Sequence, residues 1–469
     1  MSKRLPKVKA SYKVRVVGLN DAFRDTEIIY SQAVTFLINV VNSEWETLKA
    51  VVSNTNSVIQ CMERLINPTD AHPVVKYDFT KAFPCFPCYI RRAAIKAAAG
   101  CVSSYHSNHD KWVKNGKRTK EPKLQYEHYT LPVFYKGNAY VSVNSLISKI
   151  KLYNKGSWKW YIINLRKQDV KYIQKYWSGI NESAPSLVKC GKARFLRFFY
   201  EKTYVLPNTD VKDQTILAVD LGVINSAVCS VMRSDGTVAA RRFINAVAEK
   251  DQMGHALNKL KKQQRKFAPK TTPKSKGKNK TRKYNAGRKL WAKINRLNDR
   301  ISAYTAREIV KMAIEYNVYA VVFEYLDMHQ KSKGSKDARL NLWRKKAIQK
   351  MVLVHAHANN IHIYHVSASN TSALAFDGSG KVMRDKYTQN GKKLKNHSMC
   401  TFQTGKIYNC DLNATYNIGA RYFIREIIKP FSVTRRSQLE AKVPGLAKRT
   451  QSTLSTLITL NAEIAGIAA

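Results

Sequence analysis

The first half of the chain alternates between strand and helix patterns. Residues 9–18 alternate polar and apolar side chains, which predicts a strand because neighbouring strand residues point to opposite faces. From about residue 21 to residue 110 the apolar spacing is helical, and one such run stops at Gly100. Strand-like runs return between about 124 and 206. We therefore expect one β domain interrupted by a helical one.

The second half, from residue 213, begins with short apolar runs joined by tight turns. Three such runs predict an antiparallel meander at 216–220, 227–232 and 238–244. The pattern then predicts a helix, a strand, a helix and a strand, at 290–313, 318–324, 342–359 and 361–366. A last helix is expected from Asp411, and beyond Pro430 only a weak helix near 454–467 is indicated.

Charge narrows the choice of partner. The 469 residues include 81 Lys+Arg and 32 Asp+Glu, a formal net charge of +49, while 44% hydrophobic residues suffice for real cores. Such an excess repels itself unless a polyanion neutralises it, and nucleic acid does so through contacts of Lys and Arg with phosphates. A structural RNA-binding protein fits the charge equally well. A membrane surface also attracts basic proteins, but no apolar run of about 18 residues and no signal peptide is found, so we expect a cytoplasmic protein.

Two further features concern the compartment and the central segment. The eight cysteines are sparse and irregularly spaced, which indicates a reducing compartment without a disulfide framework. Residues 252–298 contain no acidic residue, and their middle, 269–280, has the composition of a loop.

Three carboxylates occupy unusual positions. Asp220 ends an apolar strand, Glu324 ends a later one, and Asp411 begins the last helix. Any one of them alone is more often a turn residue or a helix cap. As a set they have the order of a ribonuclease-H-like fold, in which such ends meet at one sheet edge. Oxygen ligands of this kind hold the two Mg²⁺ or Mn²⁺ ions that assist phosphodiester cleavage.

Five short motifs carry a resemblance to a known family. They are Asp220-Leu221-Gly222, Phe323-Glu324-Tyr325-Leu326, Asn341-Leu342-Trp343, Ser369-Asn370-Thr371-Ser372 and Asp411-Leu412-Asn413-Ala414-Thr415-Tyr416-Asn417-Ile418. Together they resemble the transposon-encoded TnpB (OrfB) nucleases and the compact type V CRISPR (Cas12-like) effectors. The resemblance is close over about 213–430 and weaker before it.

The resemblance implies an α+β multidomain fold: an OB-like wedge β-barrel with an inserted helical recognition domain, followed by a RuvC (ribonuclease-H-like) α/β nuclease domain with a degenerate zinc-ribbon-like insertion. The implied segments, in order, are wedge 1–20, recognition domain 21–120, wedge 121–212, RuvC 213–366, insertion 367–408, RuvC 409–430 and C-terminal tail 431–469.

The family implies an RNA-guided endonuclease that cuts double-stranded DNA next to a short flanking motif at one RuvC site. A guide-bound DNA-binding regulator without cleavage is one alternative, although such derivatives usually lose a carboxylate. A non-guided nuclease is another, although the large basic N-terminal half argues against it. The source of the guide, a transposon end or a CRISPR locus, stays open, as does monomer or dimer.

The insertion departs from the family pattern. Relatives carry two Cys-x-x-Cys pairs there, whereas residues 373–380 contain no cysteine, and Gln403 stands where a partner of Cys400 is expected. Cys410 lies outside the spacing, so four thiolate ligands are missing and we expect no zinc. Cys85 and Cys88 form a pair without a second one, and a core or turn position is the simpler interpretation.

The remaining site residues are expected to support the third carboxylate or to contact nucleic acid. We expect Asn413 and Asn417 to support the helix end that carries Asp411. Basic residues of the recognition domain and of the segment between the first two RuvC motifs are the candidates for phosphate contacts: Arg91, Arg92, Lys96, Lys261, Lys262, Arg265, Arg282, Lys283 and Arg288.

Overall fold

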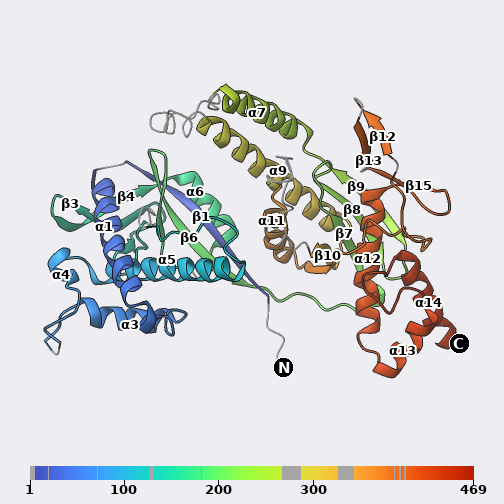
Figure 1. The fold of residues 1–469 in the computed structure, drawn as a ribbon, viewed down its shortest axis with the longest axis horizontal. Helices are drawn as coiled ribbons and strands as arrows, with labels where there is room; N and C mark the ends of the chain where they lie inside the picture. The colour runs from blue at the N-terminus through green and yellow to red at the C-terminus, as the bar shows by residue number, and fades with distance from the viewer. Residues whose placement is uncertain are drawn as a thin grey trace. The chain divides into compact units, whose positions relative to one another are not determined.

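The computed structural model of the chain divides into two compact units, each a mixture of helices and strands (Figure 1). One unit is Lys9–Lys202, and the other combines Met1–Val8 with Thr203–Ala469. The structure describes residues 6–18, 21–70, 72–125, 131–180, 182–266, 287–325, 343–384, 386–389, 392–395 and 398–468. No helix in these ranges is both long enough and apolar enough to span a bilayer.

A six-stranded sheet organises the unit Lys9–Lys202, with strand order β2-β3-β4-β1-β6-β5. The strands are β1 (Lys7–Val17), β2 (Tyr140–Ser142), β3 (Ile147–Asn154), β4 (Ser157–Leu165), β5 (Ser186–Cys190) and β6 (Ala193–Thr203). The predicted strand at 9–18 is thus confirmed as β1. Because β1 lies between β4 and β6, the chain leaves the sheet after its first strand and returns to it later.

Five helices of this unit lie between β1 and β2 in the chain, and a sixth lies between β4 and β5. They are α1 (Asp21–Ser43), α2 (Trp45–Leu48), α3 (Thr55–Ile66), α4 (Phe79–Ala82), α5 (Cys88–Lys114) and α6 (Lys167–Trp177). The apolar faces of α1 and α5 are buried, with Leu37 and Ile95 fully covered. The sequence pattern did not indicate α6, which buries only Val170 and Trp177.

A five-stranded sheet forms the centre of the second unit, with order β11-β10-β7-β8-β9. The strands are β7 (Thr215–Asp220), β8 (Ala227–Arg233), β9 (Val238–Ile244), β10 (Ala320–Tyr325) and β11 (His362–Ser367). The predicted meander is confirmed, since β7, β8 and β9 pair antiparallel. β10 runs parallel to β7, and β11 runs parallel to β10.

Both faces of this sheet are buried, and so its central strands are apolar throughout. Leu217 and Val321 belong to the core on the side of α9 (Arg288–Glu315) and α11 (Lys345–Ala358). The alternate residues Ile216 and Val322 belong to the core on the side of α12 (Cys410–Ile428) and α14 (Leu454–Ala468). Figure 1 shows the sheet between these two helical layers.

Close packing fixes the position of α12. A Cβ atom added at Gly419 would lie 2.3 Å from the Met232 sulfur atom of β8, so only glycine allows this approach. Nearby, the buried hydroxyls of Ser230 and Thr415 share a hydrogen bond of 2.6 Å. The helix that carries Asp411 is therefore held directly against the sheet that carries Asp220.

The segment between β11 and α12 has its own small core. It contains β12 (Lys386–Gln389), β13 (Lys392–Lys395), β14 (Met399–Thr401) and β15 (Ile407–Asn409). Cys400 and Cys410 are buried beside Ala375 and Phe402, and burial raises the pKa of the Cys400 thiol to about 12. These two thiols therefore pack as apolar groups.

Further helices pack on this unit within the described residues. The helix α7 (Val247–Lys266), which the sequence pattern did not indicate, packs through Leu257 and Leu260 on Ile294 of α9. The C-terminal region adds α13 (Val433–Lys442), and Leu457 and Leu460 of α14 are fully buried in the α12 core. The weak helix indicated near 454–467 is confirmed as α14.

Candidate carboxylate site and its surroundings

The structure brings the three predicted carboxylates to one edge of the five-stranded sheet. Asp220 is the last residue of β7, and Glu324 is the next-to-last residue of β10. The parallel register pairs Val219 with Phe323, which places Asp220 and Glu324 side by side one residue further on. Asp411 lies in the first turn of α12, whose N-terminal end reaches the same edge.

The three carboxylates repel one another, and this repulsion raises the pKa of Asp220. Burial raises the pKa of Asp220 well above its usual range, and the charges of Glu324 and Asp411 raise it further. Burial also raises the pKa of Glu324, opposed by a hydrogen bond from Thr371 and by the positive charge of Arg421. The charges that act on Asp220 are both negative, and a bound cation would offset them.

Two polar side chains hold the carboxylates. The Asn225 amide donates a hydrogen bond of 3.0 Å to Asp411 Oδ2, and the Thr371 hydroxyl donates to Glu324 Oε1. Thr371 lies in a motif that the sequence singled out, but Asn225 was missed. Its only sequence signal is its place in the loop 221–226 directly after Asp220.

The donor chemistry fits a hard divalent cation, since carboxylate oxygens are its preferred ligands. The present side-chain arrangement does not yet form a ligand set: within the described ranges, no three His, Cys, Asp or Glu side chains surround a common point.

The predicted supporting residues hold a neighbouring segment rather than the start of α12. Asn413 accepts a hydrogen bond from the Phe376 amide and donates one to the Leu374 carbonyl, both of 2.8 Å. Asn417 donates to the Thr371 carbonyl at 2.9 Å. The start of α12 is instead capped by Asn409. Asn417 thus acts through Thr371, which in turn contacts Glu324.

Arg421 is a buried residue that sequence reasoning missed. Its guanidinium donates to the backbone carbonyls of Ser367, Ser369, Thr450 and Ser452 at 2.7–3.1 Å. Burial lowers its pKa to about 10, while the negative charge of Glu324 opposes this. An arginine within an apolar helix face was the available signal. Arg421 therefore links the end of β11 to the C-terminal segment, and its positive charge acts on Glu324.

A half-buried lysine fixes the loop that carries Asn225. Lys250 donates hydrogen bonds to the carbonyl oxygens of Val223 and Ile224, at 3.1 and 2.5 Å. Burial lowers the pKa of Lys250 to about 8. The turn is tight as well, because a Cβ atom at Gly222 would lie 2.8 Å from the Asn225 carbonyl oxygen. Asn225 is thereby held in a defined position.

The candidate phosphate contacts fall into two groups. Arg91 is buried at 8% exposure and forms a double hydrogen bond with Glu63. The expectation of a surface contact is wrong for this residue, because its guanidinium is used inside the unit. Arg92 is half-buried against Tyr89, and Lys96 is exposed.

The candidates of the second unit lie on two packed helices. Lys261, Lys262 and Arg265 are exposed on α7, and Arg288 is exposed at the start of α9. Arg282 and Lys283 lie outside the described residues, as do Leu326, Asn341 and Leu342 of the sequence motifs.

Comparisons with known proteins found one matching family model and several similar solved structures. Residues 10–154 match the Aq_aa04 family, and no curated protein matches. The chain is similar to the protein of a Cas12f1–sgRNA–target DNA complex (15% identity, 89% of this chain and 99% of that chain covered, TM-score 0.45). It is also similar to a CRISPR–Cas12f ternary complex (16%, 85% and 80%, 0.32) and to Alicyclobacillus acidoterrestris C2c1 with single-guide RNA (10%, 86% and 69%, 0.39).

Proposed function

We propose that this protein is a divalent-metal-dependent, RNA-guided DNA endonuclease with a single RuvC-type site. The observation that carries the proposal is the meeting of Asp220, Glu324 and Asp411 at one sheet edge, with pKa values of Asp220 and Glu324 raised by burial. Burying several carboxylates together is costly without a cation. A purely structural RNA-binding protein has no use for such an arrangement.

The strand order supports the finer assignment of the nuclease domain. Three antiparallel strands followed by two parallel ones, with helices on both faces, are the layout that the motif order predicts for a ribonuclease-H-like domain. In the proposal, the six-stranded sheet of the other unit is the wedge and α1 to α5 form the recognition domain. The segment 367–408 is the zinc-free remnant of the family's ribbon.

In the proposed reaction, Asp220, Glu324 and Asp411 hold two Mg²⁺ ions, for which Mn²⁺ can substitute. Such ions, when bound, activate a water nucleophile and stabilise the leaving oxygen of the phosphodiester. The protein's own contribution is positioning: Asn225 orients Asp411, and Thr371 orients Glu324. The net charge of +49 supplies basic side chains that can neutralise the phosphates of a guide RNA and a DNA duplex.

The test of guidance is to purify the protein with its native locus expressed and to sequence the RNA that accompanies it. A repeat-spacer RNA would indicate a CRISPR guide, and a transposon-end RNA would indicate a TnpB-like enzyme. The absence of a discrete RNA would overturn the guided mechanism and favour a non-guided nuclease.

The test of catalysis uses Asp220→Ala and Glu324→Ala, with Glu440→Ala as the matched control because Glu440 is an exposed acid of α13. We expect both site variants to lose Mg²⁺-dependent cleavage of guide-matched DNA while they keep RNA binding. Full-rate cleavage by either variant would refute the site. A wild type that binds matched DNA without cutting it would favour the regulator.

A further inference from the structure

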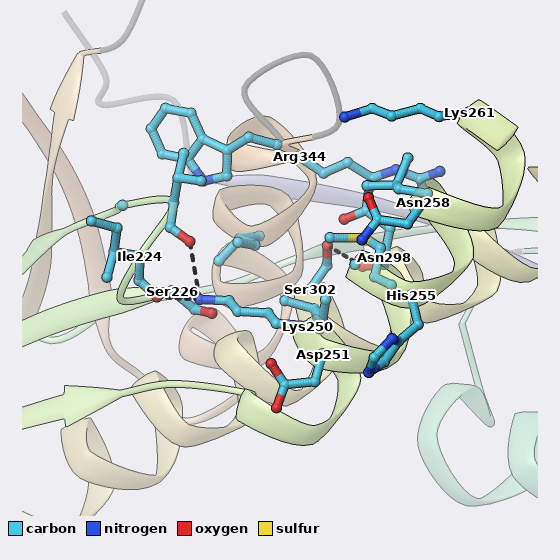
Figure 2. Close-up of a pocket in the computed structure, with 18 residues that line it drawn as sticks. Ile224, Ser226, Lys250, Asp251, His255, Asn258, Lys261, Asn298, Ser302 and Arg344 are labelled. Atoms are coloured by element: carbon cyan, nitrogen blue, oxygen red, sulfur yellow. Dashed lines mark hydrogen bonds between the residues drawn. The ribbon is translucent and has the colours of Figure 1, made fainter. Parts of the chain in front are cut away.

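A cavity of about 660 Å³ lies beside the carboxylate site, within the second unit. Its walls come from the loop 221–226, from α7 and α9, and from the start of α11 (Figure 2). The volume is in the ~300–1,000 Å³ range of small-ligand sites. Gly222, which lines the cavity, is only two residues beyond Asp220.

Two buried polar atoms of the cavity wall lack a hydrogen-bond partner among the described residues. They are the hydroxyl of Ser226, a residue only 3% exposed, and the indole Nε1 of Trp343. Leaving such groups unsatisfied in the protein interior is costly. Both atoms are covered by protein in this structure, so a ligand pairs with them only after the side chains over them move aside.

The rest of the wall combines positive charge with apolar surface. Lys250, Lys261 and Arg344 line the cavity, but Arg344 is paired with Asp299 and Lys250 is bonded to loop carbonyls, which leaves Lys261 to meet a ligand. Leu257, Ile301 and Ile348 form the apolar part. The single acidic side chain in the wall is Asp251, which Figure 2 shows on the side opposite Lys261 and Arg344. The cavity therefore suits a ligand with a flat apolar body, polar edges and a negative group.

We infer that this cavity receives one unstacked nucleotide of the DNA strand that the carboxylate site cuts. The base occupies the apolar part with its polar edge toward Ser226 and Trp343, and a neighbouring phosphate faces Lys261. An unstacked base presents the faces and edges that such a site can read. The inference rests on the proposed function, because it takes the occupant from the strand bound at the carboxylates.

Gly254 offers a way to fill the cavity without disturbing its walls. It lines the cavity from α7, and a Cβ atom added there meets no atom within 4 Å. Gly254→Phe should occupy the space of the base, whereas Gly254→Ala should leave that space open and serves as the matched control. Lys261→Ala, at an exposed position, separately removes the proposed phosphate contact.

The first measurement is the binding of the dinucleotide pTpT to the full chain by saturation-transfer NMR, with Ca²⁺ in place of Mg²⁺. Loss of one base contact typically weakens binding by about tenfold. We expect that loss with Gly254→Phe and with a pTpT analogue that lacks one base, and a change of less than about twofold with Gly254→Ala. Lys261→Ala should reduce the salt dependence of binding. Equal binding by Gly254→Phe and the wild type would overturn the inference.

The second measurement separates this inference from the proposed function. An abasic nucleotide is moved along the cut strand of a guide-matched target. At one position it should slow cleavage by the wild type and by Gly254→Ala about tenfold, without further slowing Gly254→Phe. Cleavage that ignores both the abasic sites and Gly254→Phe would reject the cavity and leave the nuclease proposal standing. Dinucleotide binding in the cavity without any DNA cleavage would support the cavity and reject the nuclease proposal.

Discussion

The side-chain amide of Asn225 donates a hydrogen bond of 3.0 Å to the carboxylate of Asp411, although the two residues are 186 positions apart. The bond joins the loop after β7 to the first turn of α12. Because Lys250 fixes the same loop through two carbonyl oxygens, the orientation of Asp411 depends on a chain of contacts rather than on its own helix alone.

Removing the Asn225 amide should impair catalysis without unfolding the protein. Partners that orient a metal ligand typically contribute 10–100-fold to metal affinity or activity. We expect Asn225→Ala to lower the cleavage rate by about tenfold and to raise the Mg²⁺ concentration needed for half-maximal rate. The exposed Asn208→Ala is the control, and an unchanged Mg²⁺ dependence in Asn225→Ala would exclude the orienting role.

Thr371 should control the acidic limb of the pH–rate profile. Its hydrogen bond lowers the pKa of Glu324, which burial otherwise raises. In Thr371→Val that pKa rises further, so a higher pH is needed to ionise the carboxylate. Single-turnover cleavage rates measured across pH should show the acidic limb shifted to higher pH, while Thr371→Ser should restore the wild-type profile. A shift to lower pH would contradict this account.

Asp220 should be a residue whose replacement stabilises the fold. Its pKa is raised, so the ionised form is disfavoured in the folded state and costs stability at neutral pH. We expect Asp220→Asn to increase the free energy of unfolding in the absence of metal by about 0.5–2 kcal/mol. Mg²⁺ should raise the Tm of the wild type by preferential binding and should do so less in the variant. Calorimetry with and without Mg²⁺ measures both effects, and a destabilised Asp220→Asn would count against the repulsive cluster.

Lys250 should make stability rise with pH in the alkaline range. Burial lowers its pKa from 10.5 to about 8, so between these values the unfolded chain binds more protons at this side chain than the folded one. Stability from this group therefore increases as pH rises through that window. Relative to Lys250→Met, the wild type should gain about 1 kcal/mol between about pH 7.5 and about pH 10 in urea unfolding. A constant difference would show that Lys250 is not buried in solution.

The sequence alone located the three carboxylates and most of the second unit. Strands buried on both faces leave uninterrupted apolar runs, and a carboxylate that ends such a run is conspicuous, as at Asp220. The meander and the helices α9, α11 and α12 follow from equally local periodicity. These features are readable because each depends on neighbours within a few positions along the chain.

Only the tertiary structure decided what surrounds the carboxylates. Asn225 and Arg421 are ordinary residues in the sequence, and their importance comes from partners far along the chain. From the sequence, Arg91 was expected to contact phosphate because it is basic. In the structure its guanidinium is buried and donates a hydrogen bond to Glu63 of another helix. Hydrogen bonds and burial of side chains are set by packing between distant segments, and local periodicity carries no record of them.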